Sequence, residues 1–456
     1  MFRDAPVIDA DAHKVEHPLV FPEFVDLPAR DRIVVVGDAA GRAVWQIDDV
    51  SAAGGRRARR FPALAGAAPG VTPFADGPTA LGALYQRVRR AEMDREGVDV
   101  QVLYPTLALS FSELLDLELA VALCRGYNDY IAAECAAAPT RLVPVGVVPA
   151  QDVAAATEEM RRCVVDLGMP AVVLPPAVPR PHPAAADAYP TVSLSRSLAD
   201  PAFAPFFETA EFLDATIAIH PVPAVAPGGC AADVLVEDLL ERRSQVQRAL
   251  AQLIVHGVLE RHSRLRFGFV DAGGGWLPDF AFGLCARWAR RAAIDAKSVF
   301  ASGRFLIEAL REGGGGGLLT RRRGVRDLRA NLGAPPPAAR DAIPPGRNPE
   351  EYFARGQIFV TCAPDDPAPI HLRQAFGPVG ERLACWSAGY GVWNGVMDDA
   401  VQRTSGNAAI GLDYVARLLS TNALRLYGER FRKRIAPGFP ASGVVRAREE
   451  KSTNVS

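Results

Sequence analysis

The chain has 456 residues, of which 49% are hydrophobic, and its formal net charge is −1. This size is sufficient for one large α/β domain or for two or three smaller domains. The charge gives no electrostatic reason to expect binding to nucleic acid or to an anionic membrane, so a small molecule is the expected partner.

The first residues, MFRDAPVIDAD, lack the basic segment and apolar core of a secretory signal. No apolar run reaches the roughly 18 residues that a membrane span requires. We therefore expect a cytoplasmic protein. The seven cysteines are widely spaced with no C-x-x-C pair, which indicates reduced, mostly buried thiols rather than disulfides or a zinc site.

Short apolar runs recur along the chain, and most are followed by a segment long enough for a helix. We predict strands in these runs, which lie at 7–13, 98–105, 142–149, 171–176, 216–221, 265–273, 357–363 and 382–387. Most of them are apolar at every position, as expected for strands that are covered on both faces.

Helical periodicity is found between these runs, in segments that start near residues 112, 152, 201 and 242. Glycine stands where two of the helices would end, in "REGVDV" and "DLG". Strands that alternate with helices predict a parallel sheet, and eight such units fit a distorted (β/α)8 barrel better than a doubly wound sheet.

We predict a single barrel over residues 1–435, followed by a C-terminal tail at 436–456. Four segments exceed ordinary loop length and are expected to be lids or disordered insertions, at about 38–80, 175–200, 222–240 and 296–355. The glycine run in the last segment lacks the Gly-Lys-Ser/Thr ending of a phosphate-binding loop. The arginine cluster in the first lacks the interleaved aromatics of a nucleic-acid surface.

Polar residues gather at the predicted strand ends, which is where a barrel places its chemistry. Asp11 and His13 end the first strand and alternate to the same side of it, His220 ends the fifth and Asp271 the sixth. Two imidazoles and one or two carboxylates are a ligand set that suits a catalytic divalent metal. The alternative for His13 and His220 is a structural, hydrogen-bonded role.

Several motifs carry a resemblance to the amidohydrolase-related family that includes aminocarboxymuconate-semialdehyde decarboxylase and γ-resorcylate decarboxylase. The similarity runs from about residue 6 to 428 and is carried by "VIDADAHKVEHP", "EMDREGVDVQVLYPT", "CRGYNDYIAAE", "RLVPVGVVPAQD", "DPAFAPFFETAEFLDATIAIHP", "RLRFGFVDAGGGWLP" and "NALRLYG". It implies a barrel with one zinc or manganese ion, decarboxylase or hydrolase chemistry, and a homodimer. Asp11, His13 and His220 match the family's metal ligands.

The resemblance implies that Asp271 handles the catalytic water or the substrate. In a partly closed barrel mouth its pKa would be raised, which would suit a general acid or base. Its alternative role is to cap the glycine-rich turn and helix that follow.

The chain departs from the family after the eighth strand, where it reads "WSAGYGVWNG". Members commonly read close to "SDYPHWDG", so Gly389 replaces a metal-binding aspartate, Val392 a histidine and Asn394 a second acid. Three explanations of how the site works without this aspartate are open. Asp271 or Glu16 supplies a carboxylate instead, three ligands suffice to bind a metal weakly, or the pocket works without a metal.

We therefore expect a decarboxylase, another lyase or a hydrolase that acts on a small carboxylated or aromatic molecule and has a degenerate metal site, with Asp271 and His220 as catalytic residues. One alternative is a metal-independent cyclase, isomerase or carbon–carbon bond-forming enzyme. Its pocket residues would be Tyr104, His13, His220, Asp271, Tyr390 and Trp393. A second alternative is a non-catalytic binding barrel.

Overall fold

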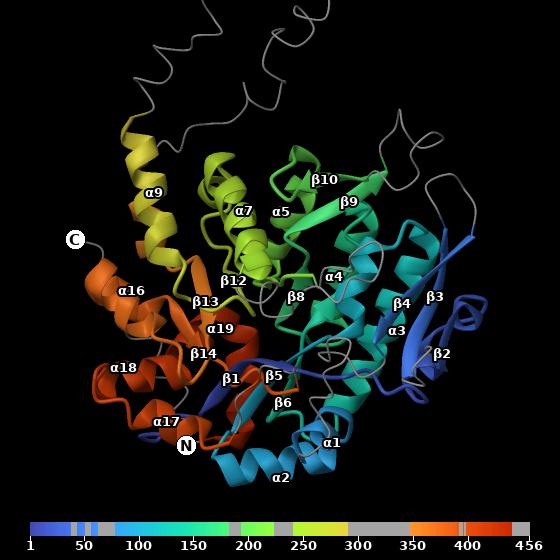
Figure 1. Cartoon of the computed structure of the whole chain (residues 1–456), viewed down its shortest axis with the longest axis horizontal. Helices are drawn as coiled ribbons and strands as arrows, with labels where there is room; N and C mark the ends of the chain where they lie inside the picture. Colours follow the sequence, from blue (N-terminus) through green and yellow to red (C-terminus); the bar gives the residue numbers. More distant parts are fainter. Residues whose placement is uncertain are drawn as a thin grey trace, which may run out of the picture.

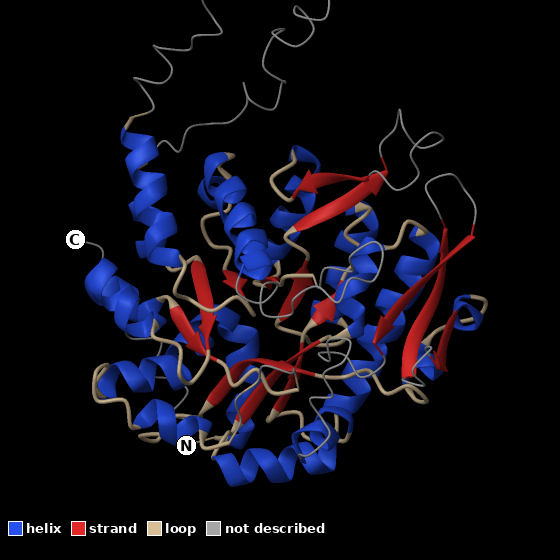
Figure 2. Cartoon of the chain, viewed as in Figure 1, coloured by secondary structure: helices blue, strands red, loops and turns tan. Residues whose placement is uncertain are grey.

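Strands and helices alternate along the chain, and the strands gather at the centre with helices around them (Figures 1 and 2). The structure is a computed structural model. It describes residues 1–37, 43–50, 56–62, 78–181, 193–222, 240–290, 347–391, 395 and 398–439.

All eight predicted runs contain a strand. The strands are β1 (Ile8–His13), β5 (Val100–Tyr104), β6 (Leu142–Pro144) with β7 (Gly146–Val147), β8 (Ala171–Leu174), β11 (Thr216–Ile219), β12 (Phe267–Phe269), β13 (Ile358–Cys362) and β14 (Ala384–Trp386). Their parallel ladders run in the orders β1-β5-β6 and β14-β13-β12-β11-β8-β7. The third run takes part in both sheets, which gives the strand sequence of a (β/α)8 barrel.

The first and eighth strands are joined by side-chain hydrogen bonds. Ser387 Oγ donates to the Asp11 carbonyl oxygen over 2.9 Å, and the Ala388 amide donates to Asp9 Oδ1 over 3.2 Å. This side of the barrel is therefore held by polar side chains that lie directly at the candidate site.

The helices cover the outside of the strands. They are α1 (Pro78–Leu84), α2 (Gln86–Glu96), α3 (Leu117–Cys135), α4 (Val153–Val165), α5 (Ala204–Phe212), α7 (Arg242–Val255), α8 (Val258–Arg261), α9 (Leu277–Ala289), α15 (Glu350–Ala354), α16 (Ala368–Phe376), α17 (Ala400–Ser405), α18 (Leu412–Ala416) and α19 (Asn422–Ile435). Asp116 and Asp152 cap α3 and α4 by accepting hydrogen bonds from backbone amides. The predicted stop at Gly97 is confirmed, since it adopts a left-handed conformation (φ 72°) directly after α2.

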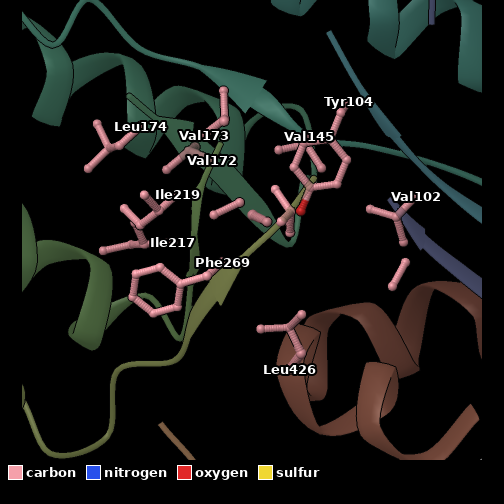
Figure 3. Close-up of a cluster of buried hydrophobic side chains, with 14 of the residues drawn as sticks. Val102, Tyr104, Val145, Val172, Val173, Leu174, Ile217, Ile219, Phe269 and Leu426 are labelled. Atoms are coloured by element: carbon pink, nitrogen blue, oxygen red, sulfur yellow. The ribbon is translucent and has the colours of Figure 1, made fainter. Parts of the chain in front are cut away.

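The core is aliphatic and aromatic and fills the space between the strands. Figure 3 shows one such cluster, with Val102, Val172, Ile217 and Phe269 contributed by four strands and Leu426 by α19. All five side chains are fully shielded from solvent. Burial of this kind on both faces explains why the strand runs are continuously apolar.

Two predicted insertions contain regular structure, so the expectation of structureless loops there is wrong. The first region carries an antiparallel sheet of β2 (Ile33–Gly37), β3 (Ala43–Val50) and β4 (Arg56–Pro62). The second carries the hairpin of β9 (Ala177–Pro181) and β10 (Ser193–Ser197). Most of the other two insertions, including the glycine run, lies outside the described residues.

Within the described residues, no helix is long and apolar enough to cross a membrane. Six of the seven cysteines fall in this part of the chain, and all six are free thiols. For these six, the prediction of unpaired thiols is confirmed.

Candidate metal centre

The side chain of Asp11 points into the barrel mouth because successive side chains of β1 alternate between its two sides. The carboxylate is almost fully buried. Its Oδ2 atom accepts hydrogen bonds from the Asp271 amide (2.8 Å) and from Thr361 Oγ1 (3.2 Å). Its Oδ1 atom is buried and has no hydrogen-bond partner. A buried oxygen without a partner is costly, so this atom is suited to a cation.

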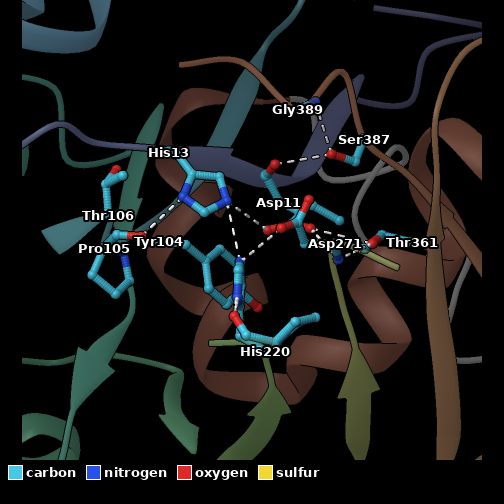
Figure 4. Close-up of polar contacts among 12 residues, drawn as sticks. Asp11, His13, Tyr104, Pro105, Thr106, His220, Asp271, Thr361, Ser387 and Gly389 are labelled. Carbon is cyan, nitrogen blue, oxygen red and sulfur yellow. Dashed lines mark hydrogen bonds and ion pairs between the residues drawn. The ribbon is translucent and has the colours of Figure 1, made fainter. Parts of the chain in front are cut away.

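The Nε2 atoms of His13 and His220 point toward each other in the same mouth, with the two rings nearly perpendicular (Figure 4). His13 Nδ1 lies 2.9 Å from the carbonyl oxygen of Pro105, and His220 Nδ1 lies 2.7 Å from that of Pro221. A carbonyl oxygen can only accept, so each Nδ1 carries the hydrogen and each Nε2 presents a lone pair. The two Nε2 atoms are 3.2 Å apart, an arrangement that a positive ion between them would stabilise.

Asp11, His13 and His220 together form a group that could hold a metal ion. One donor atom from each residue lies within 4.8 Å of the other two, and all three residues are buried. Bonds of roughly 2 Å from a common ion to nitrogen and oxygen are compatible with such separations. The predicted convergence of these residues is confirmed, and the orphaned Asp11 oxygen fits a divalent ion.

The protonation states also suit metal binding. Burial and the neighbouring His220 lower the pKa of His13 to about 3, and burial lowers the pKa of His220. Both imidazoles are therefore neutral near pH 7, as ligation requires. Burial, with the negative charges of Asp271 and Asp9, raises the pKa of Asp11 well above its usual value.

Asp271 lies next to the three residues, with Oδ2 3.7 Å from His220 Nε2. It also forms an ion pair with Arg242 at the start of α7. Burial favours a raised pKa, but Arg242 and the two histidines outweigh it and lower the pKa of Asp271. The expectation of a raised pKa is therefore wrong, because the nearby cation could not be located from sequence.

The capping role considered for Asp271 is taken by a different residue. Asp366 Oδ2 accepts a hydrogen bond from the amide of Gly274, and Asp366 Oδ1 accepts one from the amide of Ala368. The first bond holds the glycine-rich turn, and the second joins Asp366 to the first residue of α16. The described contacts of Asp271 are instead with Arg242, His220, Asp11 and Thr361.

The segment after β14 supplies no carboxylate among its described residues, 387–391 and 395. Gly389 has a φ of 59°, and its amide donates to Ser387 Oγ. Val392 and Asn394 lie outside the described residues. Glu16 is also unavailable, because its oxygens accept hydrogen bonds from the backbone amides of residues 106–108.

The tyrosines of the metal-independent alternative have hydroxyl groups engaged elsewhere. Tyr427 donates to the Ala10 carbonyl oxygen, so Tyr104 donates to Tyr427 over 2.8 Å. The Tyr390 hydroxyl donates to Glu92. These bonds weigh against either tyrosine as an acid or base, and Trp393 lies outside the described residues.

Two arginines near the site were missed by sequence reasoning. Arg242 stands in the first turn of α7, where the helix dipole disfavours a cation. An arginine at such an unfavourable position indicates a nearby acidic partner, and this signal could have been read from the sequence. Arg89 is fully buried in α2 and donates to the His13 carbonyl oxygen over 2.5 Å. No sequence pattern distinguishes Arg89 from its exposed neighbours.

A small cavity of about 10 Å³, roughly the space that one water molecule needs, lies beside His220. Its lining is mostly small and aliphatic and consists of Ala108, Leu109, Ser112, Val147, Val148, Val173, Pro175, His220 and Val222. An apolar wall with few polar groups is the usual form of a small-molecule site.

Two curated proteins that resemble the chain are decarboxylases. One is the 2-amino-3-carboxymuconate-6-semialdehyde decarboxylase of Dictyostelium discoideum, 28% identical over 41% of this chain and 47% of that protein. The other is the γ-resorcylate decarboxylase of Rhizobium sp. (strain MTP-10005), 39% identical over 18% of this chain and 25% of that protein. The chain thus spans about half of the first relative and a quarter of the second.

Solved structures of low identity share the fold. An amidohydrolase from Mycobacterium avium subsp. paratuberculosis K-10 has a TM-score of 0.63 at 20% identity, covering 93% of this chain and 100% of that one. The 5-carboxyvanillate decarboxylase of Novosphingobium aromaticivorans, with bound manganese, has a TM-score of 0.52 at 19% identity, covering 77% and 85%.

A family model also matches most of the chain. The model described as amidohydrolase matches residues 8–428, which include every strand of the barrel and the three candidate ligands. The chain therefore belongs to the amidohydrolase family.

Proposed function

We propose that this protein is a metal-dependent decarboxylase of small aromatic carboxylates. The observation that carries the proposal is the convergence of Asp11 Oδ1, which has no partner, with the facing Nε2 atoms of His13 and His220. Decarboxylase relatives and the manganese-containing decarboxylase of the same fold support the reaction class.

Asp11, His13 and His220 would hold a divalent ion, with manganese favoured by the structural relative and zinc compatible with the ligand set. Such an ion polarises a bound carboxylate or phenolate oxygen and stabilises developing negative charge. The two histidine ligands need no proton transfer to become competent, because both imidazoles are already neutral.

The chain's own residues would orient the substrate and supply the proton. The aliphatic side chains beside His220, among them Val148 and Val173, would contact one face of an aromatic ring bound at the ion and shield that face from water. Asp271 is more exposed than the three ligands and lies beside His220, so it could pass a proton from solvent to the ring carbon that loses carbon dioxide. Arg242 would attract an anionic substrate to this side.

The first experiment is elemental analysis of protein purified without chelator or metal-affinity resin, followed by an assay of carbon dioxide release from a panel of hydroxybenzoates. We expect near one equivalent of manganese or zinc, and both metal and activity should be lost in His13→Ala. His371→Ala, which changes an exposed histidine of α16, is the control and should behave as wild type.

A protein that is folded but cannot be loaded with either metal would contradict this proposal. That outcome would favour the metal-independent use of the same barrel mouth. A loaded protein that hydrolyses an ester or amide panel but releases no carbon dioxide would replace decarboxylation with hydrolysis.

A further inference from the structure

The turn after β14 forms hydrogen bonds to residues of β1. Ser387 Oγ bonds the Asp11 carbonyl oxygen, the Ala388 amide bonds Asp9, and the Gly389 amide bonds Ser387. The carbonyl oxygen of Tyr390 accepts a hydrogen bond from the His13 amide over 2.6 Å. This turn therefore acts on the site through its backbone, and the described residues of the turn leave the ion with only three protein donors.

Asp271 approaches the same place from the end of β12, which lies two strands from β14 in the sheet. Its Oδ2 lies 3.7 Å from His220 Nε2, which equals the 3.7 Å between Asp11 Oδ1 and His13 Nε2. Its amide donates to Asp11 Oδ2, so the backbone of Asp271 is tied to the first ligand. In Figure 4 the carboxylates of Asp11 and Asp271 lie next to each other, close to the two imidazoles.

The backbone of Asp271 is itself unusual. Its φ of 53° is in the left-handed region, which non-glycine residues seldom adopt. Such strain is retained when the surrounding structure requires it, and it is concentrated at functional sites. Here the left-handed residue ends β12 and carries the carboxylate that lies beside His220.

We propose that Asp271 is the fourth protein ligand of the ion and replaces the carboxylate that the turn after β14 lacks. The inference rests on the proposed metal site. Asp271 is not among the three residues whose donors all lie within 4.8 Å of one another, so its side chain has to turn from Arg242 toward the ion. A divalent ion with Asp11, Asp271 and Arg242 carries one net positive charge, which matches a monoanionic substrate.

The test is a titration of the metal-free full-length protein with Mn²⁺, following the free ion by electron paramagnetic resonance. We expect Asp271→Asn to weaken Mn²⁺ binding by at least about tenfold, since even residues that only support a ligand typically contribute ten- to a hundredfold. Asp271→Gly should weaken it similarly, and it should fold readily because glycine accepts the left-handed conformation without strain.

Asp366→Asn is the matched control, because it removes the same charge from the neighbouring turn after β13 and should leave the affinity unchanged. A Kd in Asp271→Asn and Asp271→Gly within twofold of wild type would overturn the inference while leaving the three-ligand site intact. Wild-type protein that binds no Mn²⁺ would instead overturn the proposed function and this inference together.

A rescue experiment tests the replacement directly. In the Asp271→Asn background, Gly389→Asp should recover much of the lost affinity, since it returns a carboxylate to the turn after β14. Gly389→Asn in the same background has nearly the same shape but no charge and should not recover it. Equal affinities of the two double variants would contradict the claim that Asp271 stands in for that position.

Discussion

At the scale of single residues, metal binding at the site depends on the protonation of the ligands as much as on their geometry. Asp11 has a raised pKa because it is buried beside two other acids, while the pKa of His13 is lowered to about 3. When pH falls, Asp11 therefore takes up a proton before His13 does. A metal ion binds the ionised carboxylate and must displace that proton.

This order of protonation predicts the pH dependence of metal binding. Below the pKa of Asp11 in the metal-free protein, each unit of falling pH should weaken Mn²⁺ binding by up to about tenfold, because one proton competes with the ion. Calorimetry in buffers of different ionisation enthalpy should show release of about one proton per ion bound. Release of two protons centred near pH 6.5 would show instead that the histidines titrate normally.

At the scale of elements, α2 fixes the end of β1 from outside the barrel. Arg89 of α2 donates to the carbonyl oxygens of Gly82 and His13 and to the side chain of Gln101, and its guanidinium lies 4.5 Å from the ring centre of Tyr390. Gln101 in turn donates to Asp9. One buried cation thus connects α2, β1, β5 and the turn after β14.

Arg89→Met should therefore affect both stability and the site. It leaves three acceptors without a donor, each worth about 1–3 kcal/mol when buried, so we expect a loss of at least about 3 kcal/mol in urea unfolding. Because the His13 backbone is released, Mn²⁺ affinity should also fall. Arg266→Met is the control: it removes a comparable set of bonds to Asp214 and Leu426 and should lower stability alone.

Equal Mn²⁺ affinities of Arg89→Met and Arg266→Met would show that Arg89 is only structural. Arg89→Lys adds a further distinction. Lysine keeps the buried positive charge but cannot make all three hydrogen bonds. If Arg89→Lys is more stable than Arg89→Met but binds Mn²⁺ no better, the charge contributes to stability and the hydrogen bonds position the His13 backbone.

At the scale of the whole molecule, the barrel strands are stabilised by a helix that follows all eight of them, α19. Leu426 of α19 packs into the core, where an added Cβ on Gly268 of β12 would lie 3.3 Å from it. The Leu426 carbonyl oxygen accepts hydrogen bonds from Thr216 and Arg266. The last helix therefore stabilises β11 and β12, which lead into His220 and Asp271.

Leu426→Ala should destabilise the whole barrel by about 2–5 kcal/mol, the usual range for a leucine removed from a packed core. The measurement is the midpoint of urea unfolding, followed by fluorescence and by circular dichroism. Both probes should shift together if the barrel unfolds as one unit. A shift seen by one probe only would show that α19 detaches separately.

Much of the fold could be predicted from sequence because barrel strands are local, continuously apolar runs. The runs that became β5, β8 and β13 are apolar enough to be recognised alone. The end of α2 at Gly97 was recognised because only glycine readily takes a left-handed turn. The sheet of β2, β3 and β4 was missed because β3 and β4 carry charged side chains, a composition shared with loops.

The sequence by itself determined where the barrel strands lie and that Asp11, His13 and His220 meet, because parallel barrel strands bring their ends to one mouth whatever the loops do. Only the tertiary structure decided which charged side chains lie next to one another and how they shift each other's pKa. It placed Arg242 against Asp271 and lowered a pKa that was expected to rise, and it buried Arg89 behind His13. Both outcomes depend on contacts between distant segments, and electrostatic energies depend on distance and burial, which no local pattern encodes.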